Sequence, residues 1–246
     1  MLQLSSRNKV LLLLFSLFFI TIAVGAKDLE EQGYYSNVKS AFYQDIVYVN
    51  NPDSLTVLVN KNYRLPDDYE PSDLVVLDVP LYNNDTSNEA NYLREEAADA
   101  LKELFTAAST KGHKLMARSG YRSYATQVTL YNNYVSRDGV ASADTYSARP
   151  GHSEHQTGLT VDVTADCVDH GLTESFGETP EGQWVADNAH RFGFIIRYPQ
   201  ERVLETGYQY EPWHLRYVGV ELATEMYQQN WILEDWILEN DLVKSL

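Results

Sequence analysis

Two short stretches of this 246-residue chain place histidines and carboxylates close together. The first, PGHSEHQTGLTVDV, contains His155 and Asp162, and the second, YEPWHLRYVG, contains Glu211 and His214. A hydrolytic zinc site uses three nitrogen or oxygen ligands and leaves a fourth position for water, whose pKa falls to about 7. His155, Asp162 and His214 are therefore candidate zinc ligands. Glu211 is a carboxylate that could take a proton from the water and pass it to a leaving amine.

The segment around Asp162 predicts how two of these candidates are positioned. Residues 159–163 (LTVDV) alternate as in a β-strand, so Asp162 projects from the face opposite to its valine neighbours. Gly158 precedes this strand and lets the backbone bend between His155 and Asp162 without steric cost.

The spacing of Glu211 and His214 requires a different arrangement. Pro212 disfavours a helical conformation for Glu211, the residue before it. The two side chains therefore do not share a helical face, as they would in an H-E-x-x-H motif. Their geometry must come from a bent strand or from the loop that leads into it.

Residues 164–170 (TADCVDH) offer a rival group of ligands. Asp166, Asp169 and His170 are close in sequence, but we interpret them as a solvated acidic loop, because a strand holds a ligand more rigidly than a loop does. Cys167 is the single cysteine, so an intramolecular disulfide is excluded. Its acidic neighbours would raise a thiol pKa, and we predict a structural role for it.

Hydrophobic periodicity predicts the elements that must hold these residues. Helical spacing covers residues 91–107, 124–137, 182–191, 220–231 and 232–240. Strand-like patterns cover residues 114–118, 159–163, 194–197 and 213–218, and two further runs flank an Asn-Asn-Pro-Asp turn within 46–60. Residues 65–79 contain two prolines and predict an extended arm. Helices and strands mix without regular β-α-β alternation, which favours the α+β class.

The N-terminal residues predict export from the cytoplasm. Arg7 and Lys9 precede a 17-residue apolar run, Val10–Ala26, with small residues before a possible cleavage site. This pattern is typical of a signal peptide at residues 1–26, and an uncleaved signal anchor in the membrane is the alternative. Residues 27–55 are predicted to form a lead-in. Either alternative places the remaining chain outside the cytoplasm, secreted or anchored in the membrane.

The net charge of −16 limits the possible partners. A surface this acidic argues against binding to nucleic acid or to anionic lipid through charge. It does not exclude a small peptide substrate, whose local contacts can differ in sign. We expect a monomer without a nucleic-acid partner.

Four ordered blocks of the sequence also resemble a known family. They are SGYRSYATQ (119–127), PGHSEHQTGLTVDV (150–163), GFIIRYP (193–199) and TGYQYEPWHLRYVG (206–219). Together they resemble the VanY-type D-alanyl-D-alanine carboxypeptidases and their L,D-carboxypeptidase relatives, within the wider group that holds the VanX dipeptidases. The resemblance implies a single compact zinc-peptidase domain at residues 56–246, with a small central antiparallel sheet flanked by helices.

The resemblance also implies a reaction and a role for the candidate residues. His155, Asp162 and His214 would bind Zn²⁺, and Glu211 would act as general base and acid. The substrates would be peptidoglycan stem peptides, from which the enzyme removes the C-terminal D-alanine. Either D,D- or L,D-specificity is compatible with the blocks. A D-Ala-D-Ala dipeptidase and a non-catalytic wall-binding module on the same fold are the alternatives.

Four further residues receive roles from the resemblance. Arg122 would stabilise the carbonyl oxygen or bind the substrate carboxylate. Ser153 would line the site and form a hydrogen bond with the end of the peptide. Gln127 and Tyr121 would contact the substrate in the pocket. Thr160 is a departure, since the family often has alanine there, but it lies beside the ligand strand and should not disturb the metal.

Overall fold

The structure is a computed structural model that describes residues 42–240 and 242. The described residues from 45 onward belong to one compact unit. The predicted signal or anchor at residues 1–26 and most of the lead-in at 27–55 lie outside the described residues. Within the described part, no helix is long and apolar enough to span a membrane.

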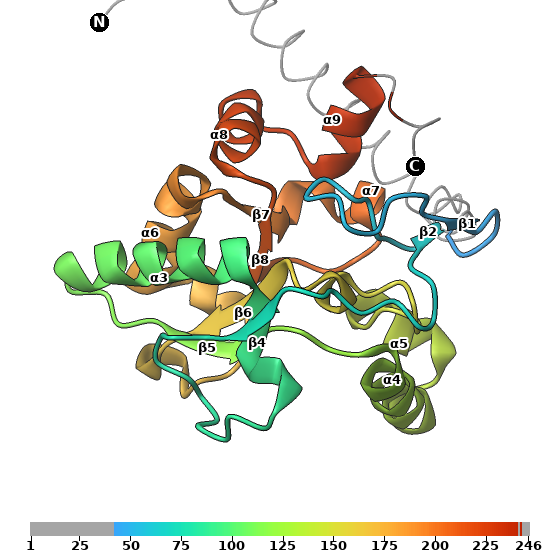
Figure 1. The fold of residues 1–246 in the computed structure, drawn as a ribbon, viewed down its shortest axis with the longest axis horizontal. Coiled ribbons are helices and arrows are strands. Elements are labelled where there is room, and N and C mark those ends of the chain that lie inside the picture. Colours follow the sequence, from blue (N-terminus) through green and yellow to red (C-terminus); the bar gives the residue numbers. More distant parts are fainter. Residues whose placement is uncertain (1–41, 241, 243–246) are drawn as a thin grey trace, which may run out of the picture. The chain divides into compact units, whose positions relative to one another are not determined.

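A four-stranded antiparallel sheet lies at the centre of this unit (Figure 1). Its strand order is β5 (Met116–Ser119), β6 (Thr160–Thr164), β8 (Glu211–Tyr217) and β7 (Phe194–Tyr198). Two pairs of short strands lie outside it: β1 (Val47–Tyr48) with β2 (Tyr63–Arg64), and β3 (Leu74–Val76) with β4 (Tyr92–Arg94). The mixture of helices with small, mainly antiparallel sheets confirms the predicted α+β class.

The two faces of the central sheet differ in chemistry. Helices α3 (Glu95–Thr110) and α6 (Pro180–Asn188) pack against an apolar core that contains Val161 of β6 and Leu215 of β8. Because side chains alternate along a strand, the residues between these apolar positions project from the other face. That face carries Asp162 and His214, and it is the face on which a polar site can form.

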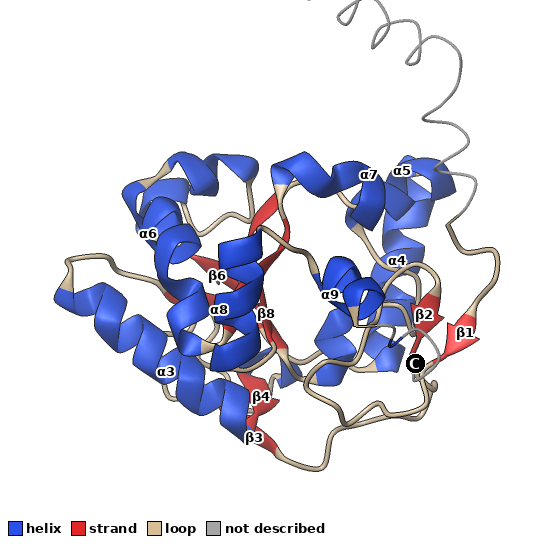
Figure 2. Ribbon diagram, turned by 90° about the horizontal axis from the view of Figure 1, so that it is seen from above, coloured by secondary structure: helices blue, strands red, loops and turns tan. Residues whose placement is uncertain are grey.

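Further helices complete the unit (Figure 2). In that view α4 (Tyr124–Asp138) and α5 (Val140–Tyr146) lie apart from α3 and α6. The short α7 (Val203–Thr206) precedes β8, and α8 (Val220–Gln229) and α9 (Leu233–Glu239) follow it. Helices α8 and α9 bury their apolar residues in a second core cluster with Leu58 and Ile195.

Several predicted elements differ from the observed ones. The helix predicted at 91–107 begins only at Glu95, because β4 pairs with β3 within the predicted arm. The second strand-like run near residue 57 is not a strand, although its apolar residues are buried. The helix predicted at 182–191 ends at Asn188, and a 3₁₀ turn, Ala189–Phe192, follows it. Strand pairing between distant residues, which local periodicity does not reveal, explains the first difference.

A substitution at Gly158 tests how closely the turn before β6 packs against β3 and β4. Its φ of 65° is left-handed, and an added Cβ would lie 2.9 Å from Leu74 Cδ2 and 3.0 Å from Arg94 Cγ. We expect Gly158→Ala to lower the free energy of unfolding by about 1–3 kcal/mol more than Gly112→Ala, measured by urea denaturation. Gly112 is a matched control, since it has a φ of 87° but no atom within 4 Å of an added Cβ. Equal losses in the two variants would show that contacts around Gly158 are unimportant.

Candidate active site

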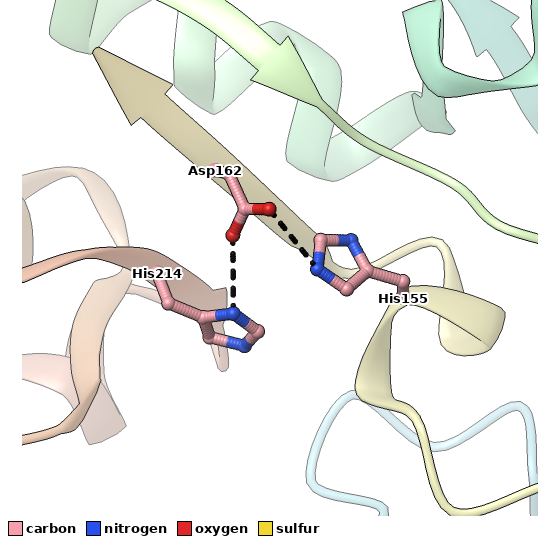
Figure 3. Close-up of side chains that lie close together, drawn as sticks. All are labelled: His155, Asp162 and His214. Carbon is pink, nitrogen blue, oxygen red and sulfur yellow. Dashed lines mark ion pairs between the residues drawn. The ribbon is translucent and has the colours of Figure 1, made fainter. Parts of the chain in front are cut away.

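The three predicted ligands meet on the polar face of the central sheet (Figure 3). His155 lies in a 3₁₀ turn, Glu154–Thr157, that leads into β6, while Asp162 lies on β6 and His214 on β8. His155 Nε2 is 3.4 Å from Asp162 Oδ2, and His214 Nδ1 is 3.1 Å from Asp162 Oδ1. All three side chains are buried, and one potential ligand atom from each lies within 4.8 Å of the other two.

Strand pairing explains why residues so far apart in sequence meet here. Asp162 and His214 are direct partners in the antiparallel register of β6 and β8. Directly opposed residues project from the same face of a sheet, so their side chains converge. His155 reaches the same point because Gly158, in a left-handed conformation, ends the turn and redirects the chain into β6.

The hydrogen bonding around these three residues fits a metal ion. His155 Nδ1 donates to the carbonyl of Gly120 at 2.7 Å, which leaves the Nε2 lone pair as a ligand. Asp162 Oδ1 is buried without a hydrogen bond, although His214 Nδ1 is near it. A buried carboxylate oxygen without a partner is costly, and a cation between the two atoms would remove that cost. Two imidazoles and one carboxylate are ligands that zinc accepts in hydrolytic sites.

The rival group after β6 has a different environment. Asp166 and His170 form an ion pair of 2.7 Å with each other, and the Asp166 side chain is 77% exposed. Among the described residues, the group that could hold a metal is His155, Asp162 and His214. Cys167 is exposed as a residue, and partial burial of its thiol together with a hydrogen bond to Glu181 raises its pKa, as expected for an unreactive thiol.

Glu211 lies beside the three ligands because β8 is irregular. In a regular strand, residues three apart project from opposite faces. The register of β7 and β8 shifts between the pairs Ile196–Leu215 and Tyr198–Glu211, and this irregularity turns Glu211 toward the ligands. Its Oε2 is 3.5 Å from His214 Nδ1. Of the two arrangements expected from Pro212, a bent strand or the loop that leads into it, the structure has an irregular strand.

The surroundings of the two carboxylates separate their pKa values. Burial raises the pKa of Glu211 to about 8, and Asp162 adds to this effect while His214 and Arg122 oppose it. Burial would also raise the pKa of Asp162, but His155 and His214 hold that pKa well below its usual range. Asp162 is thus suited to remain a charged ligand, and Glu211 is suited to bind and release a proton near neutral pH.

A cavity of about 240 Å³ opens onto these residues. Ser153 and Arg122 line it with the ligands and Glu211. Its aromatic wall consists of Tyr134, Tyr146, Tyr198, Tyr208 and Trp213. The cavity therefore combines a candidate metal site, a cation and a partly apolar wall, which is typical of a site for a small ligand.

Arg122 is held in this cavity by its own neighbours. Its Nη1 donates to Gln127 Oε1 at 2.9 Å, and its Nη2 donates to Ser119 Oγ at 3.2 Å. Gln127 is itself fixed, because its amide donates to the carbonyl of Ala148 at 2.7 Å. Gln127 thus lies behind Arg122, outside the residues that line the cavity. Its direct contact with a substrate stays a prediction, while the structure shows that it holds the guanidinium.

Tyr121 also lies outside the lining of this cavity. Its backbone N–H donates to the carbonyl of Tyr92 at 2.7 Å, and its side chain lines a separate depression with Glu70 and Glu89. A contact between Tyr121 and substrate therefore stays a prediction. Ser153, in contrast, is placed where the predicted hydrogen bond to a peptide end is possible.

Sequence reasoning missed a buried charge cluster behind the site. Glu154 lies between Ser153 and His155, and its carboxylate accepts from Arg197 Nε at 2.7 Å and Arg216 Nη1 at 2.9 Å. All three side chains are fully buried. The signal was present in the sequence, since Arg197 follows an apolar run in β7 (FIIRY) and Arg216 lies between Leu215 and Tyr217 in β8.

Metal binding by single-site variants tests the assignment of ligands. We expect His214→Ala to lose stoichiometric zinc, because it removes a ligand from a buried set of three. The matched control is His170→Ala in the rival group, which should retain wild-type zinc content. Metal content after dialysis, measured by mass spectrometry, reports both. Loss of zinc from the His170 variant with retention in the His214 variant would reverse the assignment.

Comparisons with known proteins agree with this geometry. The sequence model for VanY, D-alanyl-D-alanine carboxypeptidase, matches residues 90–220. A Bacillus subtilis (strain 168) protein described as "Putative carboxypeptidase YodJ" is 45% identical over 206 residues, which is 84% of this chain and 74% of that protein.

Two solved structures show the same fold. The LdcB LD-carboxypeptidase has a TM-score of 0.75 and 46% identity, covering 78% of this chain and 89% of that chain. A mutant of the vancomycin-resistance D,D-pentapeptidase VanY in complex with Zn(II) has a TM-score of 0.59 and 33% identity, covering 74% and 98%. The motifs, the shared fold and these similarities together show that this chain belongs to the VanY family of D-alanyl-D-alanine carboxypeptidases.

Proposed function

We propose that this chain is a zinc-dependent carboxypeptidase that removes the C-terminal D-alanine from peptidoglycan stem peptides. The observation that carries the proposal is the position of Glu211, whose carboxylate lies 3.5 Å from His214 Nδ1 at the candidate metal site. A non-catalytic binding module would need the fold but not this proton acceptor. The presence of Glu211 therefore favours catalysis over wall binding alone.

The residues that line the cavity have separate roles in the proposed reaction. A zinc ion held by His155, Asp162 and His214 would polarise the scissile carbonyl and acidify the attacking water. Glu211 accepts the proton of that water and delivers it to the nitrogen of the departing D-alanine. Arg122 binds the terminal carboxylate of the peptide through the part of its guanidinium that faces the cavity. Ser153 orients the peptide end.

Among the two possible stem peptides, we propose the tetrapeptide as the preferred substrate, which corresponds to L,D-specificity. The support is the greater similarity to the LdcB LD-carboxypeptidase, at 46% identity, than to the D,D-pentapeptidase VanY, at 33%. Incubation of the protein with tetra- and pentapeptide stems, followed by mass spectrometry of the products, tests this choice. Faster release of D-alanine from the pentapeptide would favour D,D-specificity, and cleavage of free D-Ala-D-Ala would indicate a dipeptidase.

A location outside the cytoplasm is also part of the proposal. It rests on the apolar run Val10–Ala26 behind two basic residues, which is typical of a signal or an anchor. Stem peptides of the cell wall would be accessible there.

The variant Glu211→Gln tests the proton-transfer role. We expect kcat to fall by roughly 10²–10⁴-fold, because an amide cannot accept and return the proton. Zinc content should stay at the wild-type level, since Glu211 is not a ligand. Glu221→Gln on α8 serves as a matched control and should leave kcat unchanged. Near wild-type hydrolysis by a zinc-loaded Glu211 variant would contradict the proposal.

The variant Arg122→Lys tests recognition of the carboxylate. Lysine keeps the charge but loses the planar fork that reaches Gln127, Ser119 and a carboxylate together. We expect kcat/KM to fall by about 10- to 100-fold on a peptide with a free C-terminus, the equivalent of one lost charged hydrogen bond. An amidated peptide should be a poor substrate for both proteins. Equal hydrolysis of free and amidated peptides by the wild type would exclude this role for Arg122.

A further inference from the structure

We propose that Glu154 is a positioning residue for the metal ligand His214, which it orients by accepting a hydrogen bond from Nε2–H. The inference rests on the proposed function in one respect, namely that a metal binds at Nδ1. A neutral imidazole that binds a metal through Nδ1 must carry its proton on Nε2. His214 Nε2 and Glu154 Oε2 lie 3.5 Å apart, and both are buried without another hydrogen-bond partner. They form a matched donor and acceptor that a small rotation of the ring would bring together.

Glu154 is itself fixed from the opposite side. Its Oε1 accepts from Arg197 Nε at 2.7 Å and from Arg216 Nη1 at 2.9 Å. The two arginines occupy one carboxylate oxygen and leave Oε2 directed at His214. Because all three side chains are fully buried, water does not compete for these contacts.

Distant parts of the chain hold the two arginines in turn. Arg197 donates through both terminal nitrogens to Glu234 of α9, at 2.8 and 2.7 Å. Arg216 Nη2 donates to the backbone carbonyls of Leu55 and Val57, each at 2.9 Å. A path of direct contacts therefore runs from α9 and the 55–57 segment through Glu154 to His214. These elements contribute no metal ligand, yet they determine where the ring of His214 lies.

The two histidine ligands are oriented in different ways. His155 donates Nδ1–H to the carbonyl of Gly120, which is neutral. His214 faces a carboxylate, and a carboxylate partner raises the basicity of an imidazole ligand more than a carbonyl does. Because of these partners, His155 would bind the metal through Nε2 and His214 through Nδ1. Glu154 would thus affect both the direction and the strength of the bond from His214 to zinc.

The isosteric variant Glu154→Gln tests the proposal without a substrate. Its Oε1 can still accept from Arg197 and Arg216, which turns the amide N–H₂ toward His214 Nε2–H and places two donors face to face. We expect zinc affinity to fall by about 10- to 100-fold in chelator competition. The absorption spectrum of the Co²⁺-substituted protein should also change, because the ligand field at His214 changes.

The matched control is Glu96→Gln. Glu96 accepts from the hydroxyl of Tyr217, on the same strand as His214, at 2.7 Å. It should retain wild-type zinc affinity and Co²⁺ spectrum. A Glu154→Gln protein that also retains both would overturn the inference. A wild-type protein that binds no zinc would instead defeat the proposed function, so the two failures are distinguishable.

Nitrogen-15 NMR of the histidine rings in zinc-loaded wild type gives a second test, which holds even if Glu154→Gln does not fold. We expect a proton on His214 Nε2, with its resonance shifted downfield by the carboxylate, and zinc on Nδ1. His155 should show the reverse, with its proton on Nδ1. A His214 that binds zinc through Nε2 would overturn the inference, because Nε2 could not then donate to Glu154.

Discussion

Asp162 and His214 face each other across β6 and β8, and this antiparallel pairing fixes the centre of the site. A shift of one residue in register would send one of the two side chains into the apolar core that contains Val161 and Leu215. Burial of those apolar residues beneath α3 and α6 therefore specifies the register. The packing of this core therefore sets the distance between two of the candidate metal ligands.

The face of the sheet that carries Asp162 and His214 also carries charged side chains that are buried away from water. Such groups are costly unless they are paired, and buried ion pairs often add little net stability. These buried ion pairs contribute to the geometry of the site, because each charged side chain fixes the orientation of the side chain that it contacts. Arg197 and Arg216 hold Glu154, and Glu154 faces His214. The Oδ1 atom of Asp162, which is buried without a hydrogen bond, is the oxygen of this network that faces the candidate metal site.

Local sequence patterns predicted the parts of the site that depend on neighbouring residues. The strand around Asp162 and the bend at Gly158 were predicted, and the helix at 124–137 is confirmed as α4. The role of Glu154 was not predicted, since its partners Arg197, His214 and Arg216 lie about forty to sixty residues later in the chain. For the same reason, the pairing of β4 with β3 replaced the expected start of the helix at residue 91.

A crystal structure of the zinc-loaded protein, with anomalous diffraction data at the zinc edge, would show which residues bind the metal. We expect one strong peak at about 2.0–2.2 Å from His155 Nε2, an Asp162 carboxylate oxygen and His214 Nδ1, with Glu211 adjacent but not coordinated. A peak at Asp166 and His170, or zinc bound by Glu211 in place of Asp162, would contradict this expectation.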